Sequence, residues 1–376
     1  MKQKVNNKTI LINSISNFLD DDGSMQKIAR SFVQLGYKVI YIEKPLSFFN
    51  LARNWNIIFI LLKRIFSKKS NSLQNNLVIY NPGIFPILGY FFDYFRKEYE
   101  LRKLREFQHK NFDFIINYDP LGDYFIDLCS KFYKNSSIMF YNTQDFLETP
   151  QPNFLKKIRS KSLSKMYNYK SIKIIVSNPN LSKYGKYDLL LYGGVELDRF
   201  RFRFKDIDPK NINVIYHGTF NVALDYELIL ELVKSKPRIK FNFLGSIKDS
   251  NPLINKILSH KNVQYYDPIP YSDVGSMISQ FDIGFIPYKV DKLTDSVTSL
   301  KLYEYLSLGM PVVTTSYSEA KKSDSKLFFL EDSKAFQNAS LLTKSDLKNN
   351  FKNASKKSWL SNAKKIIRLN ENTHFK

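Results

Sequence analysis

The sequence predicts an α/β protein made of two Rossmann-like domains that face a central cleft. Short apolar runs rich in β-branched residues alternate with amphipathic segments along the chain, which is the pattern of parallel strands joined by helices on both faces of a sheet. The alternation stops at a polar, charged segment, 199–211, and then starts again. A chain of 376 residues, 43% of them hydrophobic, is long enough for two such domains.

The first domain is predicted to cover residues 1–198. Its expected strands are Thr9–Ile15, Val39–Glu43, Leu77–Pro82, Phe112–Tyr118, Ser137–Asn142 and Ile172–Ser177. The second domain is predicted to cover 212–354, with strands at Asn213–Thr219, Ile239–Gly245, Val263–Ile269, Asp282–Tyr288 and Pro311–Thr315. Segment 199–211 contains Pro209 and is the predicted linker. Ligands are expected at the carboxyl ends of the strands in each domain.

A short, sharply bounded helix is predicted between the last two of these strands. Gly309 stands where a left-handed C-cap residue belongs, and Pro311 follows it. The possible N-caps are Ser296, Thr298 and Ser299. The start of a helix has unpaired N–H groups and a partial positive charge that favour a phosphate, and Lys301 adds a full charge in the first turn. A diphosphate would suit this position.

Glu304 lies three residues after Lys301, so the two side chains are expected on one helix face, one turn apart. A carboxylate there could accept hydrogen bonds from the vicinal hydroxyls of a ribose. The alternative is an exposed Lys/Glu pair worth a few tenths of a kcal/mol. The spacing fits a nucleotide sugar, and the surrounding motifs favour that interpretation.

This block is similar to the nucleotide-sugar signature of group 1 glycosyltransferases with the GT-B fold, in which a lysine and a glutamate on such a helix hold the diphosphate and the ribose. Other landmarks follow the family in order: Val176-Ser177-Asn178 with Leu181, Gly193 to Phe200, Asn262-Val263 leading into Pro268 to Tyr271, and Ser358-Trp359. The resemblance is closest to bacterial cell-surface polysaccharide enzymes, such as the teichuronic acid type. It implies those roles for Lys301 and Glu304, and a final helix, 355–376, that packs back on the first domain.

The same resemblance implies further donor-binding residues. In the family, the backbone at Gly218 and Thr219 approaches the donor phosphates, and the base lies near Ile269; Tyr288 ends the neighbouring strand. The alternative for Gly218 is simply a tight strand-to-helix turn. Two features depart from many relatives: segment 221–226 has no Arg or Lys, and Ser296 stands where retaining members carry a glutamate. Retention or inversion therefore stays open, and Ser296, Thr298 and Ser299 are candidates to bind the diphosphate.

An inverting transfer needs a general base, and Asp145 is the candidate because it follows the strand Ser137–Asn142 on the expected ligand side. A helix cap or a turn is the alternative role, and Asp119 and Asp20–Asp22 are rival bases. The four histidines are not spaced as metal ligands are. The run Asp20–Asp22 fits a solvated loop or an acceptor contact better than a metal site. Transfer is therefore expected to need no metal or other cofactor, with a nucleotide sugar as substrate.

The cellular compartment is predicted from the cysteine content and from the length of the apolar runs. The single cysteine, Cys129, excludes an internal disulfide and is expected to be a small buried residue. The apolar run Thr9–Ile12 is too short for a signal peptide. Neither Trp55–Phe66 nor Ile84–Phe95 reaches the roughly 20 residues of a membrane span. A cytoplasmic protein is predicted.

A net charge of +22 and a pI near 9.6 predict an anionic partner. Residues 154–173 are predicted to form a basic amphipathic helix, and 55–69 joins an apolar run to further basic residues. We expect both segments to dock on the anionic inner face of the cell membrane, through Lys63, Arg64, Lys156, Lys157, Arg159, Lys161 and Lys165. The alternative is a solvated basic face. The acceptor is then expected to be a surface glycan or a lipid-linked glycan.

Functions other than a UDP-sugar glycosyltransferase are also compatible with parts of this sequence. A nucleotide-sugar epimerase or a non-catalytic nucleotide-sugar binder could share the fold, because fold does not fix function. A nucleic-acid-binding protein would also carry this charge. However, the sequence has no recognition helix, RNP-like motif or zinc finger, so no nucleic-acid partner is expected.

Overall fold

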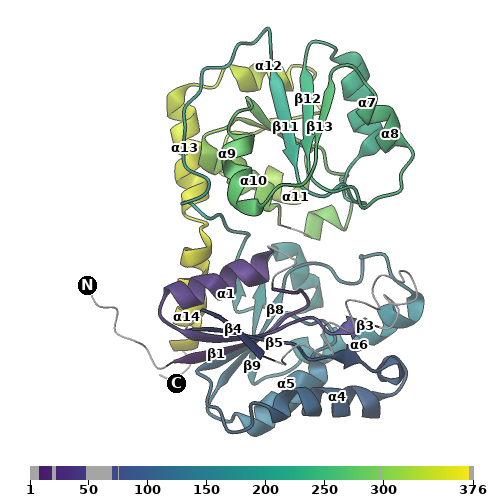
Figure 1. Cartoon of the computed structure of the whole chain (residues 1–376), viewed down its shortest axis with the longest axis vertical. Coiled ribbons are helices and arrows are strands. Elements are labelled where there is room, and N and C mark those ends of the chain that lie inside the picture. Colours follow the sequence, from purple (N-terminus) through teal and green to yellow (C-terminus); the bar gives the residue numbers. More distant parts are fainter. Residues whose placement is uncertain (1–7, 19–22, 48–69, 75, 297, 372–376) are drawn as a thin grey trace. The chain divides into compact units, whose positions relative to one another are not determined.

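The computed structural model describes residues 8–18, 23–47, 70–74, 76–296 and 298–371. The chain divides into two compact units. Unit 1 comprises Met1–Leu191 with Asn362–Lys376, and unit 2 comprises Tyr192–Ser361. Each unit is built on its own sheet (Figure 1).

Unit 1 contains an eight-stranded sheet in the order β10-β9-β8-β7-β1-β2-β5-β4. All neighbours are parallel except β4, which pairs antiparallel with β5 at the edge. The strands are β1 Thr9–Asn13, β2 Lys38–Ile42, β4 Ser70–Gln74, β5 Leu77–Tyr80, β7 Phe114–Asn117, β8 Ser137–Asn142, β9 Ile172–Val176 and β10 Leu189–Leu190. The strand order reverses between β1 and β7. A small sheet pairs β3 Leu46–Ser47 with β6 Ile84–Phe85.

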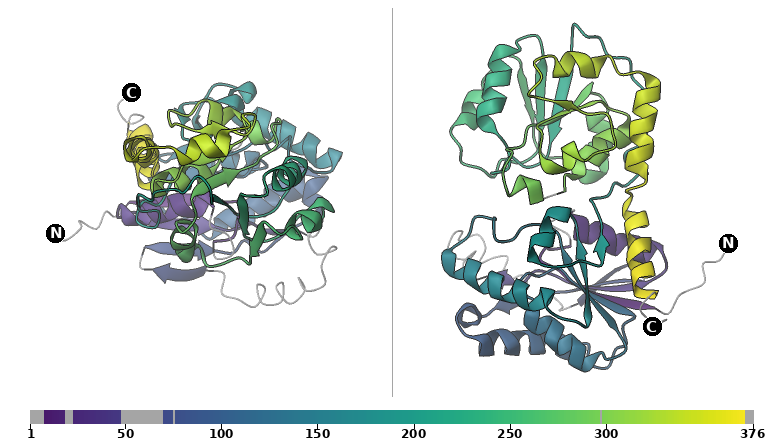
Figure 2. Two further views of the ribbon diagram at one scale, coloured as in Figure 1. Left: turned by 90° about the horizontal axis from the view of Figure 1, so that it is seen from above. Right: turned by 180° about the vertical axis from the view of Figure 1, so that it is seen from behind.

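Helices cover both faces of this sheet (Figures 1 and 2). Helix α1 lies on one face, and α4, α5 and α6 lie on the other. The helices of unit 1 are α1 Ser24–Gln34, α4 Asp93–Arg105, α5 Asp123–Phe132 and α6 Asn153–Tyr167, with short 3-10 turns η1 Ile87–Tyr90 and η2 Pro179–Tyr184. Leu104, Phe125 and Leu163 pack on the strands in one buried cluster. Cys129 is buried in the same cluster, as predicted.

Unit 2 contains a six-stranded, fully parallel sheet in the order β13-β12-β11-β14-β15-β16. Its strands are β11 Asn213–His217, β12 Lys240–Leu244, β13 Val263–Tyr266, β14 Ile283–Ile286, β15 Val312–Thr314 and β16 Phe328–Phe329. The chain first builds outward from β11 to β13 and then returns to the other side of β11. The strand order therefore reverses between β11 and β14.

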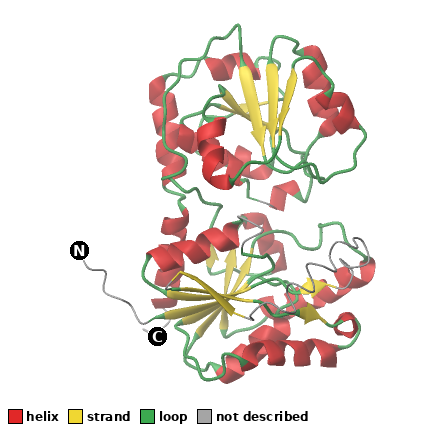
Figure 3. Cartoon of the chain, in the orientation of Figure 1, coloured by secondary structure: helices red, strands yellow, loops and turns green. Residues whose placement is uncertain are grey.

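Two hydrophobic cores, one on each face of this sheet, hold the helices of unit 2 (Figure 3). One face carries α7 Tyr226–Ser235, α8 Leu253–Leu258 and α12 Ala335–Ser340. The other carries α9 Tyr271–Ile278, α10 Leu300–Leu308, α11 Ser318–Lys321 and α13 Lys344–Ser355. Alternate residues of β11 point to opposite faces, Val214 and Tyr216 to the first and Ile215 to the second. The last helix is α14 Trp359–Glu371.

Each run predicted as a strand contains one, so the predicted pattern of parallel strands and covering helices is confirmed. The helix predicted over 154–173 is too long. It ends at Tyr167 with Asn168 as its C-cap, and β9 begins at Ile172. The edge strands β4, β10 and β16 were not predicted, because β4 is a polar run, SNSLQ, and β10 and β16 have only two residues each. Among the described helices, none has the length and apolar character that crossing a bilayer requires.

We predict that Gly284→Ala lowers the free energy of unfolding by roughly 1–3 kcal/mol, a typical cost of overpacking a core. A Cβ at Gly284 would lie 2.4 Å from two ring carbons of Tyr305, so α10 would have to move away from β14. Urea unfolding followed by circular dichroism measures the change. Ser276→Ala, on an exposed position of α9, is the control and should leave stability nearly unchanged. Equal stability of Gly284→Ala and wild type would contradict this packing.

Candidate functional site

The candidate site lies where the strand order of unit 2 reverses. In open α/β sheets, ligands bind outside the carboxyl ends of the strands at such a point. His217 ends β11, Tyr288 follows β14 by two residues, and α10 comes next along the chain. The residues predicted to bind a donor therefore belong to helix α10 and to the loops at this edge of the sheet.

Helix α10 has the caps that the sequence predicts. Ser299 is its N-cap, and Gly309 is its C-cap with a left-handed φ of 77°. Such a φ favours glycine because it brings no Cβ into contact with the backbone. Lys301 lies in the first turn of the helix and Glu304 one turn later.

Lys301 lies directly against the backbone of Gly218. A Cβ on Gly218 would be 2.5 Å from Cε and 2.7 Å from Nζ of Lys301, and its φ of 126° also favours glycine. Nζ lies 3.4 Å from the Tyr288 hydroxyl. It also lies over the rings of Tyr216 and Tyr288, at 5.4 and 5.9 Å from their centroids. The structure therefore brings three of the predicted residues together, Gly218, Tyr288 and Lys301.

Within the described part of the chain, no carboxylate lies within ion-pair distance of the Lys301 ammonium. Burial lowers its pKa, but Tyr216, Tyr288 and Glu304 outweigh this effect, and the pKa lies above its ordinary value. The side chain is a cation at neutral pH. A cation with only tyrosine partners, at the start of a helix, suits an anionic ligand.

Glu304 is buried rather than exposed, with 3% of its surface accessible. Its Oε1 accepts a 2.5 Å hydrogen bond from the Tyr271 hydroxyl, and Oε2 lies 2.7 Å from Nε2 of His217. Neither partner was singled out from the sequence. His217 adjoins Gly218 and Tyr271 closes the Pro268–Tyr271 motif, but a sequence does not reveal that both meet a residue on α10.

The hydrogen-bond partners of His217 indicate that a proton lies between its Nε2 and Glu304 Oε2. The Tyr305 hydroxyl donates to the carbonyl oxygen of Ile215 at 2.8 Å. Nδ1 of His217, 2.9 Å from the Tyr305 oxygen, must then donate to that oxygen. Nε2 and Glu304 Oε2 therefore share one further proton, whichever atom holds it. Glu304 is oriented by two neighbours before any ligand binds.

The hydroxyl residues before α10 differ in their contacts, and Ser299 Oγ is buried without a hydrogen-bond partner among the described residues. Ser296 Oγ donates to the carbonyl of Leu293 at 2.7 Å. Thr298 packs on Gly193, where a Cβ would lie 2.6 Å from its methyl group. The backbone N–H of Ser299 donates to Glu319 Oε2 at 2.7 Å, and Glu319 Oε1 accepts from Tyr303 at 2.6 Å. Glu319 thus fixes the start of α10, and no sequence motif marks it.

Two further predicted residues lie at the same edge of the sheet without a contact to Lys301. Thr219 Oγ1 lies 3.3 Å from Ser246 Oγ. Ile269, in the loop after β13, packs against the buried cluster that contains α10. Their roles toward a ligand stay predictions.

Asp145, the predicted base, is fully buried. Its carboxylate accepts hydrogen bonds from the Lys183 ammonium, the Tyr184 hydroxyl and the Leu147 N–H. Burial raises its pKa, but the bonds from Lys183 and Tyr184 outweigh burial and lower the pKa from its ordinary value. A carboxylate with these partners is a weaker base, and its catalytic role stays a prediction.

The predicted membrane residues differ in their surroundings. Lys156, Lys157 and Lys161 are exposed on α6, whereas Leu163 and Met166 of that helix belong to the core of unit 1. Lys165 pairs with Asp127 at 2.6 Å. Arg159 is half-buried and donates to Gln151 at 2.6 Å. Of the predicted membrane residues that the structure describes, Lys156, Lys157 and Lys161 are therefore the exposed ones, and Lys161 also lies 3.5 Å from Asp93. Lys63 and Arg64 lie outside the described residues.

No group of three or more His, Cys, Asp or Glu side chains that could hold a metal ion occurs within the described ranges. Asp20–Asp22 lie outside those ranges.

Comparison with solved structures identifies the fold. Sucrose-phosphate synthase from Thermosynechococcus elongatus superposes with a TM-score of 0.71 at 12% identity, over 98% of this chain and 99% of that chain. Anabaena HepE in complex with UDP-glucose gives a TM-score of 0.57 at 11% identity, over 95% and 94% of the two chains. The chain has the GT-B fold.

One curated relative gives a more particular likeness. The chain is similar to the putative teichuronic acid biosynthesis glycosyltransferase TuaH of Bacillus subtilis strain 168, at 30% identity over 106 residues. That match covers 28% of this chain and 27% of the length of TuaH. No protein-family model matches the chain.

We predict that Glu319 makes stability depend on pH. Burial raises the pKa of Glu319 from 4.5 to about 7, so the folded state holds a proton that the unfolded state releases near pH 4.5. Protonated Glu319 therefore contributes fully to the free energy of unfolding below pH 4.5. This contribution falls by roughly 3 kcal/mol as the pH rises through 7. Glu319→Gln should flatten the change in urea midpoint between pH 5 and 8. Glu227→Gln, exposed on α7, should not. A wild-type midpoint independent of pH in this range would contradict the burial argument.

Proposed function

We propose that this protein is a glycosyltransferase that moves a sugar from a nucleoside diphosphate sugar, with UDP as the expected nucleotide, to a surface-glycan or lipid-linked acceptor. The observation that carries the proposal is the Lys301 ammonium, which has only tyrosine partners among the described residues and lies against Gly218 at the start of α10. A donor diphosphate would supply the missing negative charge and could also accept from the first N–H groups of the helix.

Glu304 is proposed to bind the donor ribose. Each oxygen of a carboxylate can accept more than one hydrogen bond, so a ribose hydroxyl could bond to Oε1 of Glu304 together with Tyr271. The partners of Glu304 would hold the carboxylate in position for that contact. Gly218, Thr219, Ile269, Tyr288, Ser296, Thr298 and Ser299 complete the proposed donor site.

Two likenesses support this proposal. HepE was solved with UDP-glucose, which favours UDP as the nucleotide. TuaH is described as a putative enzyme of teichuronic acid biosynthesis, which favours a cell-surface polysaccharide as the product. We assign donor binding to residues 212–354 and acceptor binding to residues 1–198, and we propose transfer without a metal ion. The leaving diphosphate would be stabilised by Lys301 and the helix N-terminus instead.

We predict that wild-type protein binds UDP in isothermal titration, and that Lys301→Ala weakens binding by about tenfold or more, because a charge-assisted contact is lost. Glu304→Ala and Gly218→Ala should also weaken it. Gly218→Ala acts by displacing the lysine, because its Cβ would lie 2.5 Å from Lys301 Cε. Lys292→Ala, an exposed lysine before α10, is the control and should bind as wild type does.

The same titration is run with GDP and ADP, and with magnesium or chelator. Affinity that collapses in chelator would remove metal independence from the proposal. A folded wild-type protein that binds no nucleotide would overturn the function itself. A protein that binds UDP and converts a UDP-sugar in the absence of any acceptor would be an epimerase. A protein that binds UDP but converts no UDP-sugar would be a non-catalytic binder.

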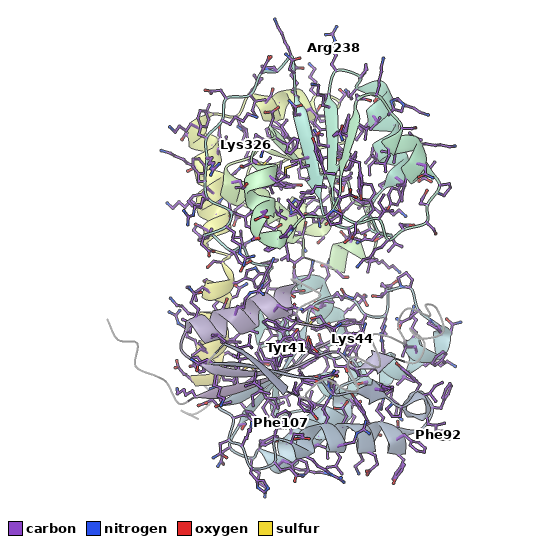
Figure 4. The ribbon with its side chains drawn as sticks, in the orientation of Figure 1. Tyr41, Lys44, Phe92, Phe107, Arg238 and Lys326 are labelled. Carbon is purple, nitrogen blue, oxygen red and sulfur yellow. The ribbon has the colours of Figure 1, made fainter. Side chains whose placement is uncertain are left out.

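We also propose that unit 1 docks on an anionic membrane surface, on the cytoplasmic side. Large apolar side chains are exposed around η1 and the start of α4, with Phe91 61%, Phe92 57% and Tyr94 68% exposed; Figure 4 labels Phe92 at the edge of unit 1. The Phe91 ring stacks on Phe154 of α6 at 5.6 Å, which joins this apolar patch to the exposed lysines of that helix. Apolar side chains beside lysines suit the boundary of an anionic bilayer.

Sedimentation with vesicles containing phosphatidylglycerol tests this docking. At low salt we expect wild type to pellet, and the double change Lys156→Glu/Lys157→Glu to reduce partitioning by about tenfold or more, at roughly 1 kcal/mol per basic residue. Lys364→Glu/Lys365→Glu makes the same charge change on exposed positions of α14. Equal losses in both variants would indicate a general effect of net charge and count against this surface.

A further inference from the structure

A pocket of about 230 Å³ opens in unit 1, apart from the proposed donor site. Its wall includes at least one residue from the loop after each of four parallel strands, such as Ile15 after β1, Lys44 after β2, Asp119 after β7 and Gln144 after β8. Strands β1 and β7 flank the point where the strand order of this sheet reverses. The pocket thus occupies the position in unit 1 where an open α/β sheet binds its ligand.

Two cations, Arg159 and Lys44, line this pocket. Arg159 donates from Nη1 to Gln151 at 2.6 Å, and its Nε is buried with no hydrogen bond from the described residues. Lys44, labelled in Figure 4, is exposed. No described carboxylate lies within ion-pair distance of either side chain. The edge of the guanidinium that includes Nε matches the two oxygens of a carboxylate or a phosphate.

The two acidic residues of the lining differ in their surroundings. Glu100 is buried and its Oε2 lies 2.6 Å from the Lys103 ammonium, so its charge has a partner behind the pocket. The charge of Asp119, in contrast, acts on Arg159 and opposes the lowering of the Arg159 pKa by burial. Asp119 Oδ1 accepts from the backbone N–H of Leu121 at 2.8 Å. Asp119 still has lone pairs for a hydroxyl of a ligand. Asp145 is not among the lining residues, although Gln144 and Phe146 on either side of it are.

The rest of the lining suits a sugar ring. Phe85 and Tyr90, with ring centroids 4.8 Å apart, form an aromatic wall, and Gln144 and Thr149 supply polar groups. Aromatic faces pack against the C–H faces of a sugar while amides and carboxylates bind its hydroxyls. The volume lies below the roughly 300–1,000 Å³ typical of drug-sized ligands. One ring with its substituents is therefore the expected size of the occupant.

We propose that this pocket binds a sugar that carries a carboxylate or a phosphate, and that Arg159 and Lys44 select for the anionic group. The inference rests on the proposed function, because such a sugar would be the terminal residue of the acceptor. It also gives Arg159 a different role from the membrane contact that the sequence suggests. Arg159 lies on the same helix as exposed Lys157, but it faces the pocket rather than solvent.

Saturation-transfer NMR on the full chain tests the proposal. The probes are methyl glucuronide for the carboxylate, glucose 1-phosphate for the phosphate, and methyl glucoside as the neutral sugar. Wild type should bind at least one anionic probe more tightly than the neutral one, and the stronger of the two identifies the anionic group. Arg159→Gln should weaken the binding of that probe by about tenfold or more, as expected when a charged hydrogen bond is lost. Lys157→Gln should leave it unchanged.

Lys44→Gln provides a second variant, on an exposed side chain, and it should weaken binding of the same probe. Equal binding of charged and neutral sugars, or binding that survives both pocket variants, would overturn the proposal. UDP is titrated into each sample. If UDP binds while no anionic sugar does, this inference fails alone. If sugars bind while UDP does not, the donor proposal fails and the pocket stands.

Discussion

The contact between the Gly218 backbone and the Lys301 side chain determines the geometry of the candidate donor site. The lysine packs closely against the end of a strand, where only a glycine leaves room for its Cε and Nζ. The tyrosine rings beside the ammonium hold it by cation–π contacts but supply no full negative charge. The fold therefore carries a positive charge that a bound anion would neutralise, and this gives the site its chemical preference.

Correct placement of Lys301 depends in turn on how α10 packs on the sheet. Gly284 lets the ring of Tyr305 lie against β14, and the Tyr305 hydroxyl then bonds to Ile215 and His217 at the end of β11. One aromatic residue thus joins the helix to both strands at which the strand order reverses. Loss of packing at Gly284 would disturb His217, and through it Glu304. The core and the candidate site of unit 2 are one connected structure.

Local sequence pattern predicted much of this arrangement. The parallel strands, the caps of α10, and the positions of Lys301 and Glu304 in its first two turns follow from periodicity and capping chemistry. The partners of Glu304 could not be predicted, because His217 lies 87 positions away from it and only the tertiary fold brings them together. The helix predicted over 154–173 was too long because its basic residues continue past the C-cap. Charge alone does not mark where a helix ends.

Partners, rather than residue type, decide what each polar side chain in unit 1 can do. Asp145 and Asp119 both follow parallel strands, and the sequence offers both as bases. Asp145 is enclosed by Lys183, Tyr184 and a backbone N–H, which stabilise its charge and fix the loop after β8. The Asp119 carboxylate accepts from one backbone N–H and lines the pocket, where its charge acts on Arg159 without an ion pair among the described residues. A carboxylate that already neutralises a neighbouring cation gains little by accepting a proton, whereas one at a pocket wall can still exchange a hydrogen bond with a ligand. By this argument Asp119 is the better placed of the two to touch an acceptor hydroxyl, and Asp145 the better placed to hold the loop that shapes its pocket.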